Sequence, residues 1–299
     1  MDGLKTKEDR RFQTFWVIFF ILISVIAIIP VLRVISISFS GRDAINKGQV
    51  FIFPIGFNVD AYAKALKSGT FVSSFGYSII LMAVVTAVDM IMTILLAYPL
   101  SRPNYKYKKI ATFFIFFTML FSGGLIPTYI WITRYLHLGD TIWVYILPCL
   151  VNAFHVIVIR SFFQGLPQAL MESAKIDGAS ELQTFFKIVM PLSKPVIATI
   201  SLLTLLSRWN DWNTALIYIK SSNLYSLQYL LQKILREAEF VKNMAESSPV
   251  AGVDLDLSNL PSVTIRFAMC MVAAGPMLII FPFFQKYFAK GLTVGAVKG

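Results

Sequence analysis

Residues 75–100 read FGYSIILMAVVTAVDMIMTILLAYPL, an apolar run in which Asp89 is the single charged residue. A helix needs about 20 mostly apolar residues to cross the hydrocarbon core of a bilayer. This run exceeds that length, whereas the buried strands of soluble proteins are far shorter. The stretch therefore predicts a transmembrane helix, and the rest of the chain can be compared with it.

The composition of the whole chain indicates the same class of protein. Of its 299 residues, 57% are hydrophobic and 14% are charged, against roughly 45–50% and about 25% in an ordinary soluble domain. These values exclude a disordered chain, a fibrous chain and a soluble Rossmann or TIM-barrel enzyme. Cys149 and Cys270 both lie in apolar runs, so we interpret them as small buried hydrophobic residues rather than as a disulfide pair.

Apolar stretches of similar length recur along the chain, at roughly residues 15–39, 75–100, 110–132, 141–159, 195–219 and 262–287. We therefore predict an all-α membrane protein with six transmembrane helices. In this interpretation residues 1–14 form an N-terminal segment, residues 15–290 form one transmembrane domain, and residues 291–299 form a C-terminal tail. The first run is too long to be the apolar part of a cleavable signal peptide.

The net charge of +11 is divided unevenly between the predicted loops. Both termini and the loops at 101–109 and 160–194 carry 15 of the 27 Lys and Arg residues, and the other three loops carry nine. With the acidic residues included, the first set has a charge of +9 and the second a charge of +1. The positive-inside rule therefore predicts that both termini and the 160–194 loop are cytoplasmic. Topology explains the basic charge, so no nucleic-acid partner is expected.

The predicted cytoplasmic loop at 160–195 is long for a simple connector. Pro167 suits the first turn of a helix, and Gly178 suits its left-handed end. Ser180 and Gln183 have the spacing of a capping box that begins a second helix, which Pro191 is expected to end. The apolar residues of the loop are Leu170, Ala174, Leu182, Phe185, Phe186 and Ile188. They indicate either a docking surface for a partner or a pair of helices folded back on the bundle.

This loop resembles the EAA loop of permease subunits from bacterial ABC importers. The family pattern is Glu-Ala-Ala, two residues, Asp-Gly-Ala, eight residues, then Ile-x-Leu-Pro. The matching residues are Glu172, Ser173, Ala174, Asp177, Gly178, Ala179, Ile188, Met190 and Pro191, where Ser173 replaces alanine and Met190 replaces leucine. The resemblance implies that the loop forms a coupling helix that sits in a cleft of the ATP-hydrolysing subunit. Glu172 would reach toward that subunit, and Gly178 would permit the turn between the helices.

The rest of the chain resembles the carbohydrate branch of that family, the second permease subunit of maltose-type and multi-sugar importers. The similarity lies in the predicted spans, in Trp209-Asn210-Asp211-Trp212, and in the tail from Gly291 to Gly299. It implies the type I ABC importer permease fold in the bacterial cytoplasmic membrane, and a path for a sugar or oligosaccharide. The implied partners are a second permease subunit, two nucleotide-binding ATPase subunits, an extracytoplasmic solute-binding protein and membrane lipid.

ATP and Mg²⁺ would bind to the ATPase subunits, and no cofactor or metal is expected in this chain. It has no Gly-x-x-x-x-Gly-Lys-Ser/Thr motif to hold nucleotide phosphates. The chain is therefore expected to be a transport subunit and not an enzyme.

The candidate substrate path consists of polar and aromatic residues in the fourth and fifth spans. Hydrogen-bonding groups and flat aromatic faces suit a sugar, and an arginine suits the carboxylate of an acidic sugar. The other interpretation is that Arg208 and Asp211 neutralise each other as an (i, i+3) pair and that the tryptophans are interfacial anchors. The candidate residues are Arg208, Trp209, Asn210, Asp211, Trp212 and Asn152.

Charged residues inside spans cost about 2.5–3.5 kcal/mol each on translocon scales, so they need partners. Asp89, Arg33 and Arg266 are expected either to pair across the bundle or to line the path. An alternative function is an ion-coupled secondary transporter that uses Asp89, His155 and Asp211. His155 is more simply explained by hydrogen bonding between helices, and an integral-membrane enzyme lacks a convergent set of polar groups.

The predicted outer loop at 220–261 contains an amphipathic part with leucines and isoleucines at helical spacing. It is interpreted either as an interfacial or cavity-covering helix or as a loop packed on the bundle.

Overall fold

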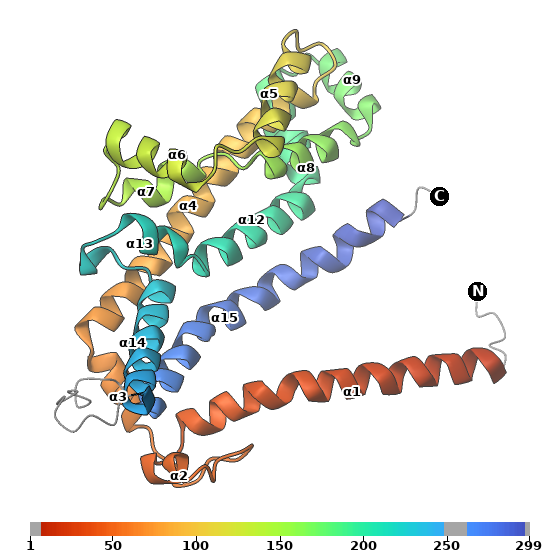
Figure 1. Ribbon diagram of the computed structural model, residues 1–299. Coiled ribbons are helices and arrows are strands. Elements are labelled where there is room, and N and C mark those ends of the chain that lie inside the picture. The colour runs from red at the N-terminus through yellow and green to blue at the C-terminus, as the bar shows by residue number, and fades with distance from the viewer. Residues whose placement is uncertain (1–6, 248–261, 297–299) are drawn as a thin grey trace. The chain divides into compact units, whose positions relative to one another are not determined.

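The computed structural model describes residues 7–247 and 262–296, and all the regular structure in those ranges is helical. The first six residues of the predicted N-terminal segment and the last three of the predicted tail lie outside these ranges. The chain divides into two compact units, one of residues 1–69 and 233–274 and the other of residues 70–232 and 275–299. Figure 1 shows the helices of both units.

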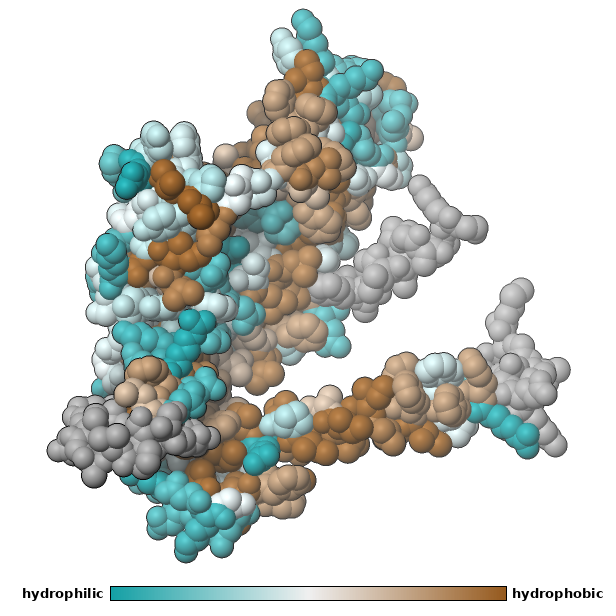
Figure 2. All heavy atoms as spheres, in the orientation of Figure 1, coloured by the Kyte–Doolittle hydropathy of each residue, from teal (hydrophilic) through white to brown (hydrophobic). Residues whose placement is uncertain are grey.

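The first unit is dominated by one long helix, α1 (Lys7–Ser38). It also holds α2 (Arg42–Asn46) and α3 (Asp60–Lys67), with the later part of α14 (Leu227–Ser247) and the earlier part of α15 (Val263–Ala296). No residue in the most apolar stretch of α1 is buried within the chain, and Figure 2 shows hydrophobic residues along most of its visible length. Such a surface requires lipid or another apolar chain around it.

The second unit is built around α4 (Gly69–Ser101), which supplies buried residues along its length. The other elements of this unit are short. They are α5 (Lys108–Leu120), α6 (Leu125–Ile130), the π-helical turn η1 (Trp131–Tyr135), α7 (Trp143–Ile146), the 3₁₀ turn η2 (Leu147–Cys149), α8 (Ala153–Gln164), α9 (Gln168–Ile176), α10 (Glu181–Thr184), the π-helical turn η3 (Phe185–Val189), α11 (Met190–Leu192), α12 (Lys194–Trp209), α13 (Asn213–Tyr218) and the 3₁₀ turn η4 (Ser222–Leu224).

Two apolar clusters hold the second unit together. One joins α4 to α8, η3 and α12 through residues such as Ala97, Ile159, Phe185 and Ile200. The other joins α4 to η1, α7 and α13 through Leu81 and its neighbours. Small and branched residues pack closely where helices cross. Helix α4 contributes residues to both clusters and so contacts most of the other elements of this unit.

Three helices are long and apolar enough to cross a membrane, namely 11–38 of α1, α4, and 263–285 of α15. Three bent helix pairs pass the same test together, which gives up to six spans if each pair is one span. The pair 108–120 and 125–135 is bent by 113°, at the Gly123-Gly124 sequence. Glycine at 124 has φ +85°, a conformation that side-chain-bearing residues rarely adopt. The predicted third span is therefore a broken element and not a straight helix.

The predicted fifth span is also interrupted. Helix α12 ends at Trp209 and α13 begins at Asn213, so the polar Trp209–Trp212 segment forms a break rather than part of a continuous helix. The amphipathic part of the 220–261 loop is a helix, α14, with Leu227, Leu230 and Leu231 buried. Residues 248–261 of that loop lie outside the described ranges.

Candidate functional site

The 160–195 loop folds into two helical segments joined at Gly178. Gly178 has φ +75°. Its N–H donates to the carbonyl of Lys175 at 3.1 Å, and the N–H of Ala179 donates to the carbonyl of Ala174 at 2.9 Å. This pair of bonds is a Schellman end for α9, which satisfies carbonyls that the helix would otherwise leave unpaired. The left-handed end predicted from the sequence is confirmed.

The second segment begins with a capping box. The Gln183 N–H donates to Ser180 Oγ at 3.2 Å, and the Ser180 N–H donates to Gln183 Oε1 at 2.9 Å. The expectation that Pro191 ends this helix is wrong, because the segment continues through Pro191 to Leu192. The π-helical turn η3 precedes Met190, and the segment ends at Leu192, one residue after Pro191.

The second segment is fastened to the end of α4. Tyr98 Oη donates to Glu181 Oε2 at 2.8 Å, and the Arg102 guanidinium lies 3.7 Å from the same carboxylate oxygen. The guanidinium also lies over the Tyr98 ring, 4.4 Å from its centroid, and the Phe185 ring centroid is 4.6 Å from that of Tyr98. Phe185 is buried in the cluster shared by α4, α8 and α12. The folded-back interpretation therefore holds for this segment.

The first segment behaves differently, because α9 and the turn after it leave apolar residues uncovered. Ala174 alone is buried in α9, whereas Ile176 is 85% exposed and Leu170 is 43% exposed. Glu172, Ser173, Asp177 and Gly178 are exposed as well. An apolar surface rimmed by polar residues marks an interaction site, so the docking interpretation retains its physical basis for α9.

Ile188 and Pro191 belong to the later part of the EAA-like pattern and lie in η3 and α11. Ile188 is partly buried, and Pro191 borders a hollow of about 660 Å³ that Phe186, Lys194 and Phe283 also line.

A buried polar cluster lies midway along α4, centred on Asp89, which is 2% exposed. His155 Nδ1 of α8 is 3.1 Å from Asp89 Oδ2, Thr204 Oγ1 of α12 donates to that oxygen at 3.0 Å, and Thr93 Oγ1 donates to Oδ1 at 3.2 Å. The cluster therefore joins three helices through one carboxylate. Interhelical hydrogen bonding, which the sequence predicted for His155, is confirmed. Asp89 is hydrogen-bonded to side chains of α8 and α12.

Asp211 belongs to a separate group. Arg208 Nη1 lies 3.6 Å from Asp211 Oδ2, as the (i, i+3) spacing predicted. The same Nη1 donates to Cys149 Sγ at 2.9 Å. Asp211 also accepts bonds from the N–H and the hydroxyl of Thr214, which begins the turn of α13. Both partners of the ion pair are thus held by neighbours as well as by each other.

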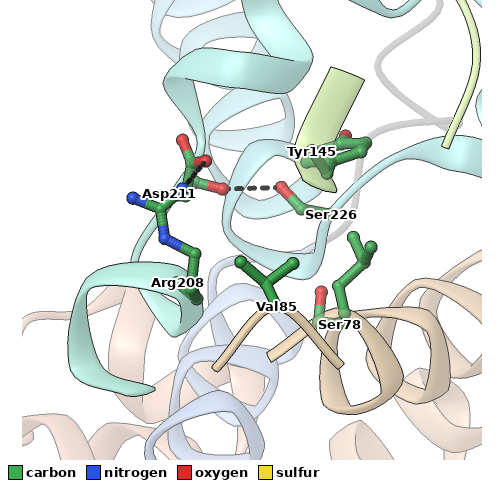
Figure 3. Close-up of a pocket in the computed structure, with 7 residues that line it drawn as sticks. Ser78, Val85, Tyr145, Arg208, Asp211 and Ser226 are labelled. Carbon is green, nitrogen blue, oxygen red and sulfur yellow. Dashed lines mark hydrogen bonds and ion pairs between the residues drawn. The ribbon is translucent and has the colours of Figure 1, made fainter. Parts of the chain in front are cut away.

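Arg208 lies between two hollows of the second unit. The smaller, of about 10 Å³, is drawn in Figure 3, where the guanidinium and the Asp211 carboxylate lie on one side and Tyr145 and Ser226 on the other. The larger, of about 160 Å³, is lined by Asp89, His155, Asn152 and Cys149 as well as by Arg208. Ligand pockets usually measure about 300–1,000 Å³. Both hollows beside Arg208 are smaller than this. In this conformation the chain therefore lines one polar side of a sugar site and does not enclose it.

The remaining candidate path residues have structural contacts of their own. Trp209 is 2% exposed and packs edge to face on Phe75, with ring centroids 6.0 Å apart. Asn210 donates to the Leu206 carbonyl at the end of α12. Asn152 caps α8 by accepting from the N–H groups of Phe154 and His155, although it also borders the larger hollow. Trp212 is half-buried beside the ion pair.

Asp140 was not singled out from the sequence, and it closes a connection outside the predicted helices. Asp140 Oδ1 accepts from the N–H groups of Lys220 at 2.9 Å and Ser221 at 2.8 Å, and Oδ2 accepts from Ser221 Oγ at 2.6 Å. Its own N–H donates to the Tyr218 carbonyl at 2.9 Å. Asp140 has φ +56°, which aspartate tolerates better than most residues. An aspartate after glycine, Gly139-Asp140, is the one local hint.

Hydrogen bonds from the Ser221 hydroxyl, and then from the Ser221 and Lys220 amides, hold the pKa of Asp140 below its ordinary value of 3.8. A carboxylate with a depressed folded-state pKa stabilises the fold above its ordinary pKa, and that stabilisation is lost as the pH falls through the folded-state pKa. We expect Asp140→Asn to speed hydrogen exchange at Lys220 and Ser221 at pH 7. The difference from the unaltered chain should shrink as the sample is brought below pH 3.8.

Asparagine is the matched change for this measurement, because it keeps an acceptor and tolerates positive φ. Exchange at residues 168–176 of α9 serves as the internal reference, because the hydrogen-bond partners of Asp140 are Tyr218, Lys220 and Ser221. Equal exchange at Lys220 and Ser221 in both chains at pH 7 would contradict the assignment of the pKa shift to these bonds.

Among the described residues there is no group of three or more His, Cys, Asp or Glu that could hold a metal ion. What the second unit contains is a set of broken helices around polar side chains, with an exposed helix-turn-helix at one end. Discontinuous helices around polar groups are a construction of membrane transport proteins, and the architecture defines the class as a transport subunit of the membrane.

Comparison with known proteins gives the family. Residues 90–294 match the model of the binding-protein-dependent transport system inner membrane component, and the chain belongs to that family. It is 40% identical to protein LplC of Bacillus subtilis over 98% of this chain and 97% of that protein. It is 37% identical to the polygalacturonan/rhamnogalacturonan transport system permease YtcP of the same organism, over 98% of this chain and 100% of that protein.

The fold also matches a solved structure. A chain of a bacterial ABC transporter involved in the import of the acidic polysaccharide alginate superposes with a TM-score of 0.82 and 28% sequence identity, over 96% of this chain and 99% of that one. The expected permease class and carbohydrate branch are confirmed. The chain is accordingly an all-helical, non-enzymatic component of the cell membrane.

Proposed function

We propose that this chain is the membrane subunit of an ATP-driven importer, in which it forms part of the path for an oligosaccharide. The 160–195 loop receives the motion of ATPase subunits, which bind ATP and Mg²⁺. One observation carries the proposal: α9 presents uncovered apolar residues, while the segment that follows it is fastened to α4 through Glu181 and Phe185. Force applied to α9 is thereby delivered to the helices around Asp89 and Arg208.

The proposed complex contains a second permease subunit, two ATPase subunits and an extracytoplasmic solute-binding protein. The family is described as binding-protein-dependent, which supports the last of these. The incomplete polar wall around Arg208 supports the second permease, because another surface is needed to close a sugar site of ordinary size. Six spans and cytoplasmic termini complete the proposed arrangement, in line with the distribution of basic residues.

The proposed substrate is an oligosaccharide that contains uronic acid residues. Relatives named for polygalacturonan/rhamnogalacturonan transport and for alginate import support this class. Arg208 supplies the chemistry, because a guanidinium can exchange its contact with Asp211 for a sugar carboxylate. The distance of 3.6 Å in the Arg208–Asp211 pair is longer than a direct charged hydrogen bond, so this contact is a weak competitor for a sugar carboxylate.

The test is uptake by the complete complex in liposomes, with labelled oligogalacturonate and a neutral oligosaccharide of equal length as substrates. We expect uptake to require ATP and the ATPase subunits. Arg208→Gln should raise the concentration for half-maximal uptake of the acidic sugar by about tenfold to a hundredfold, since a charged hydrogen bond contributes about 1.5–3 kcal/mol. Uptake of the neutral sugar, if the complex carries it, should change little.

Two further variants separate recognition from folding. Arg208→Lys keeps the charge and should lose less than Arg208→Gln. Asp211→Asn breaks the same ion pair but leaves the cation in place, so it should not reproduce the loss for the acidic sugar. Uptake driven by an ion gradient without any ATPase would contradict the proposed function, whereas equal effects of Arg208→Gln and Asp211→Asn would contradict the substrate class alone.

A further inference from the structure

The first unit contains a loop without charged residues between α2 and α3. Residues 49–59 read QVFIFPIGFNV and contain no charged side chain. Phe51, Phe53, Ile55, Phe57 and Val59 are all exposed, with Phe53 at 78% and Phe57 at 71%. Two neighbouring side chains are covered instead, because Val50 is buried and Ile52 is half-buried. The loop thus presents an apolar edge outward, which a segment in water would not retain without a partner.

The loop is held against the last turns of α1. The Gly41 N–H donates to the Ile55 carbonyl at 3.0 Å, the Ile55 N–H donates to Ser40 Oγ at 3.0 Å, and the Asn58 N–H donates to the Phe39 carbonyl at 2.9 Å. Ser36 Oγ donates to the Ile52 carbonyl. Figure 1 shows this loop after α2, folded back beside the end of α1. These bonds give partners to four backbone groups of the loop, and burial of such groups near lipid requires partners of this kind.

The contacts with α1 also set the depth of the loop. The apolar part of α1, Arg11–Ser38, has 28 residues and is about 42 Å long at 1.5 Å per residue, against roughly 30 Å for the hydrocarbon core. A helix of that length tilts or extends past the boundary with the headgroups at its ends. The Arg33 guanidinium lies 5.9 Å from the centroid of the Phe51 ring, and an arginine at this position is placed most cheaply at that boundary.

From this geometry we infer that the 49–59 loop is a membrane anchor, whose aromatic edge enters the headgroup–acyl boundary beside α1. The exposed rings are continuous with the exposed apolar surface of α1, where Ile28 and Val31 are uncovered. Aromatic side chains are favoured at this level of a bilayer. The loop offers no charged residue to the polar rim of a soluble partner's interface. The lipid surface is therefore the occupant that fits.

The test uses the complete complex in liposomes, with a nitroxide attached to Phe53→Cys and, in a second chain, to Ile55→Cys. The matched control is Lys47→Cys, an exposed polar position just after α2 in the same connecting segment. The unaltered chain, with Cys149 and Cys270, gives the background label. We expect labels at 53 and 55 to collide severalfold more often with oxygen, and severalfold less often with a water-soluble nickel complex, than the label at 47.

Addition of the solute-binding protein should leave the label at 53 unchanged. Nickel accessibility at 53 and 55 equal to that at 47 would overturn the inference. Shielding of these labels from both reagents would also overturn it and would indicate a protein surface instead of lipid. The result depends on neither ATP nor sugar, so failure of the proposed transport function leaves this test unaffected.

Discussion

Gly178→Val is expected to abolish sugar uptake by the complex while leaving its ATPase subunits bound. Position 178 has φ +75°, and a Cβ built there meets nothing within 4 Å. The penalty is therefore conformational rather than a clash, about 1–2 kcal/mol for a side-chain-bearing residue and more for a β-branched one. The cheapest relief is to open the turn and reorient α9. We expect uptake to fall by at least about tenfold, as measured in liposomes together with ATP hydrolysis.

The matched control is Gly178→Asn, because asparagine adopts the left-handed conformation at small cost. It should retain most of the uptake, whereas Gly178→Val should hydrolyse ATP without transport. Co-purification of the ATPase subunits with both variants shows that the membrane fold has survived. Unchanged coupling in Gly178→Val would count against α9 as the element that receives the motion of the ATPase. Glu172→Ala, an exposed change on the same helix, should uncouple in the same direction without altering the turn.

Asp89→Ala is expected to destabilise the membrane domain by roughly 2–5 kcal/mol. The change removes the acceptor shared by His155, Thr93 and Thr204. Hydrogen bonds between membrane helices average about 0.6 kcal/mol each, and a buried polar group left without its partner costs about 1–3 kcal/mol. The measurement is the midpoint of thermal denaturation of the complex in nanodiscs, which should fall by several degrees.

Asp89→Asn is the control for this cluster, because the amide oxygen still accepts from Thr204 and from the histidine. It should lose much less stability than Asp89→Ala. The same variant tests the ion-coupled alternative, since an ion-binding carboxylate cannot be replaced by an amide without loss of coupling. ATP-dependent uptake that persists in Asp89→Asn would agree with a structural role, whereas loss of uptake at unchanged stability would contradict it.

The positions of the helices were largely predictable, because length and apolar content alone place a membrane helix. The local structure of the 160–195 loop was predictable for the same kind of reason. Gly178 and the Ser180–Gln183 pair act through backbone bonds to residues three to five positions away. Their effect can therefore be predicted from the local sequence. Pro191 was misjudged because the π-helical turn before it allows the helix to continue, and nothing in the apolar pattern announces such a turn.

Pairing between helices was less predictable. Asp89 and His155 are 66 residues apart, and their contact depends on the rotation and depth of α4 and α8. The sequence indicated that both residues need hydrogen-bonding partners, but it did not predict that they bond to each other. Arg208 and Asp211 were matched correctly, because they share one turn. Asp140 was missed, since two of the three bonds to its carboxylate come from backbone N–H groups, which nearly every residue carries.

The connection made by Asp140 has a consequence for how the chain is assembled. Its partner Ser221 is made 81 residues later, and the Leu227 N–H that donates to Ser78 Oγ at 2.7 Å is made 149 residues after its acceptor. Neither bond can form until α7, α8, α12 and α13 have been synthesised and threaded into the bilayer. A chain that ends before residue 221 therefore leaves the Asp140 carboxylate hydrated by water and this connection between the two loops unmade.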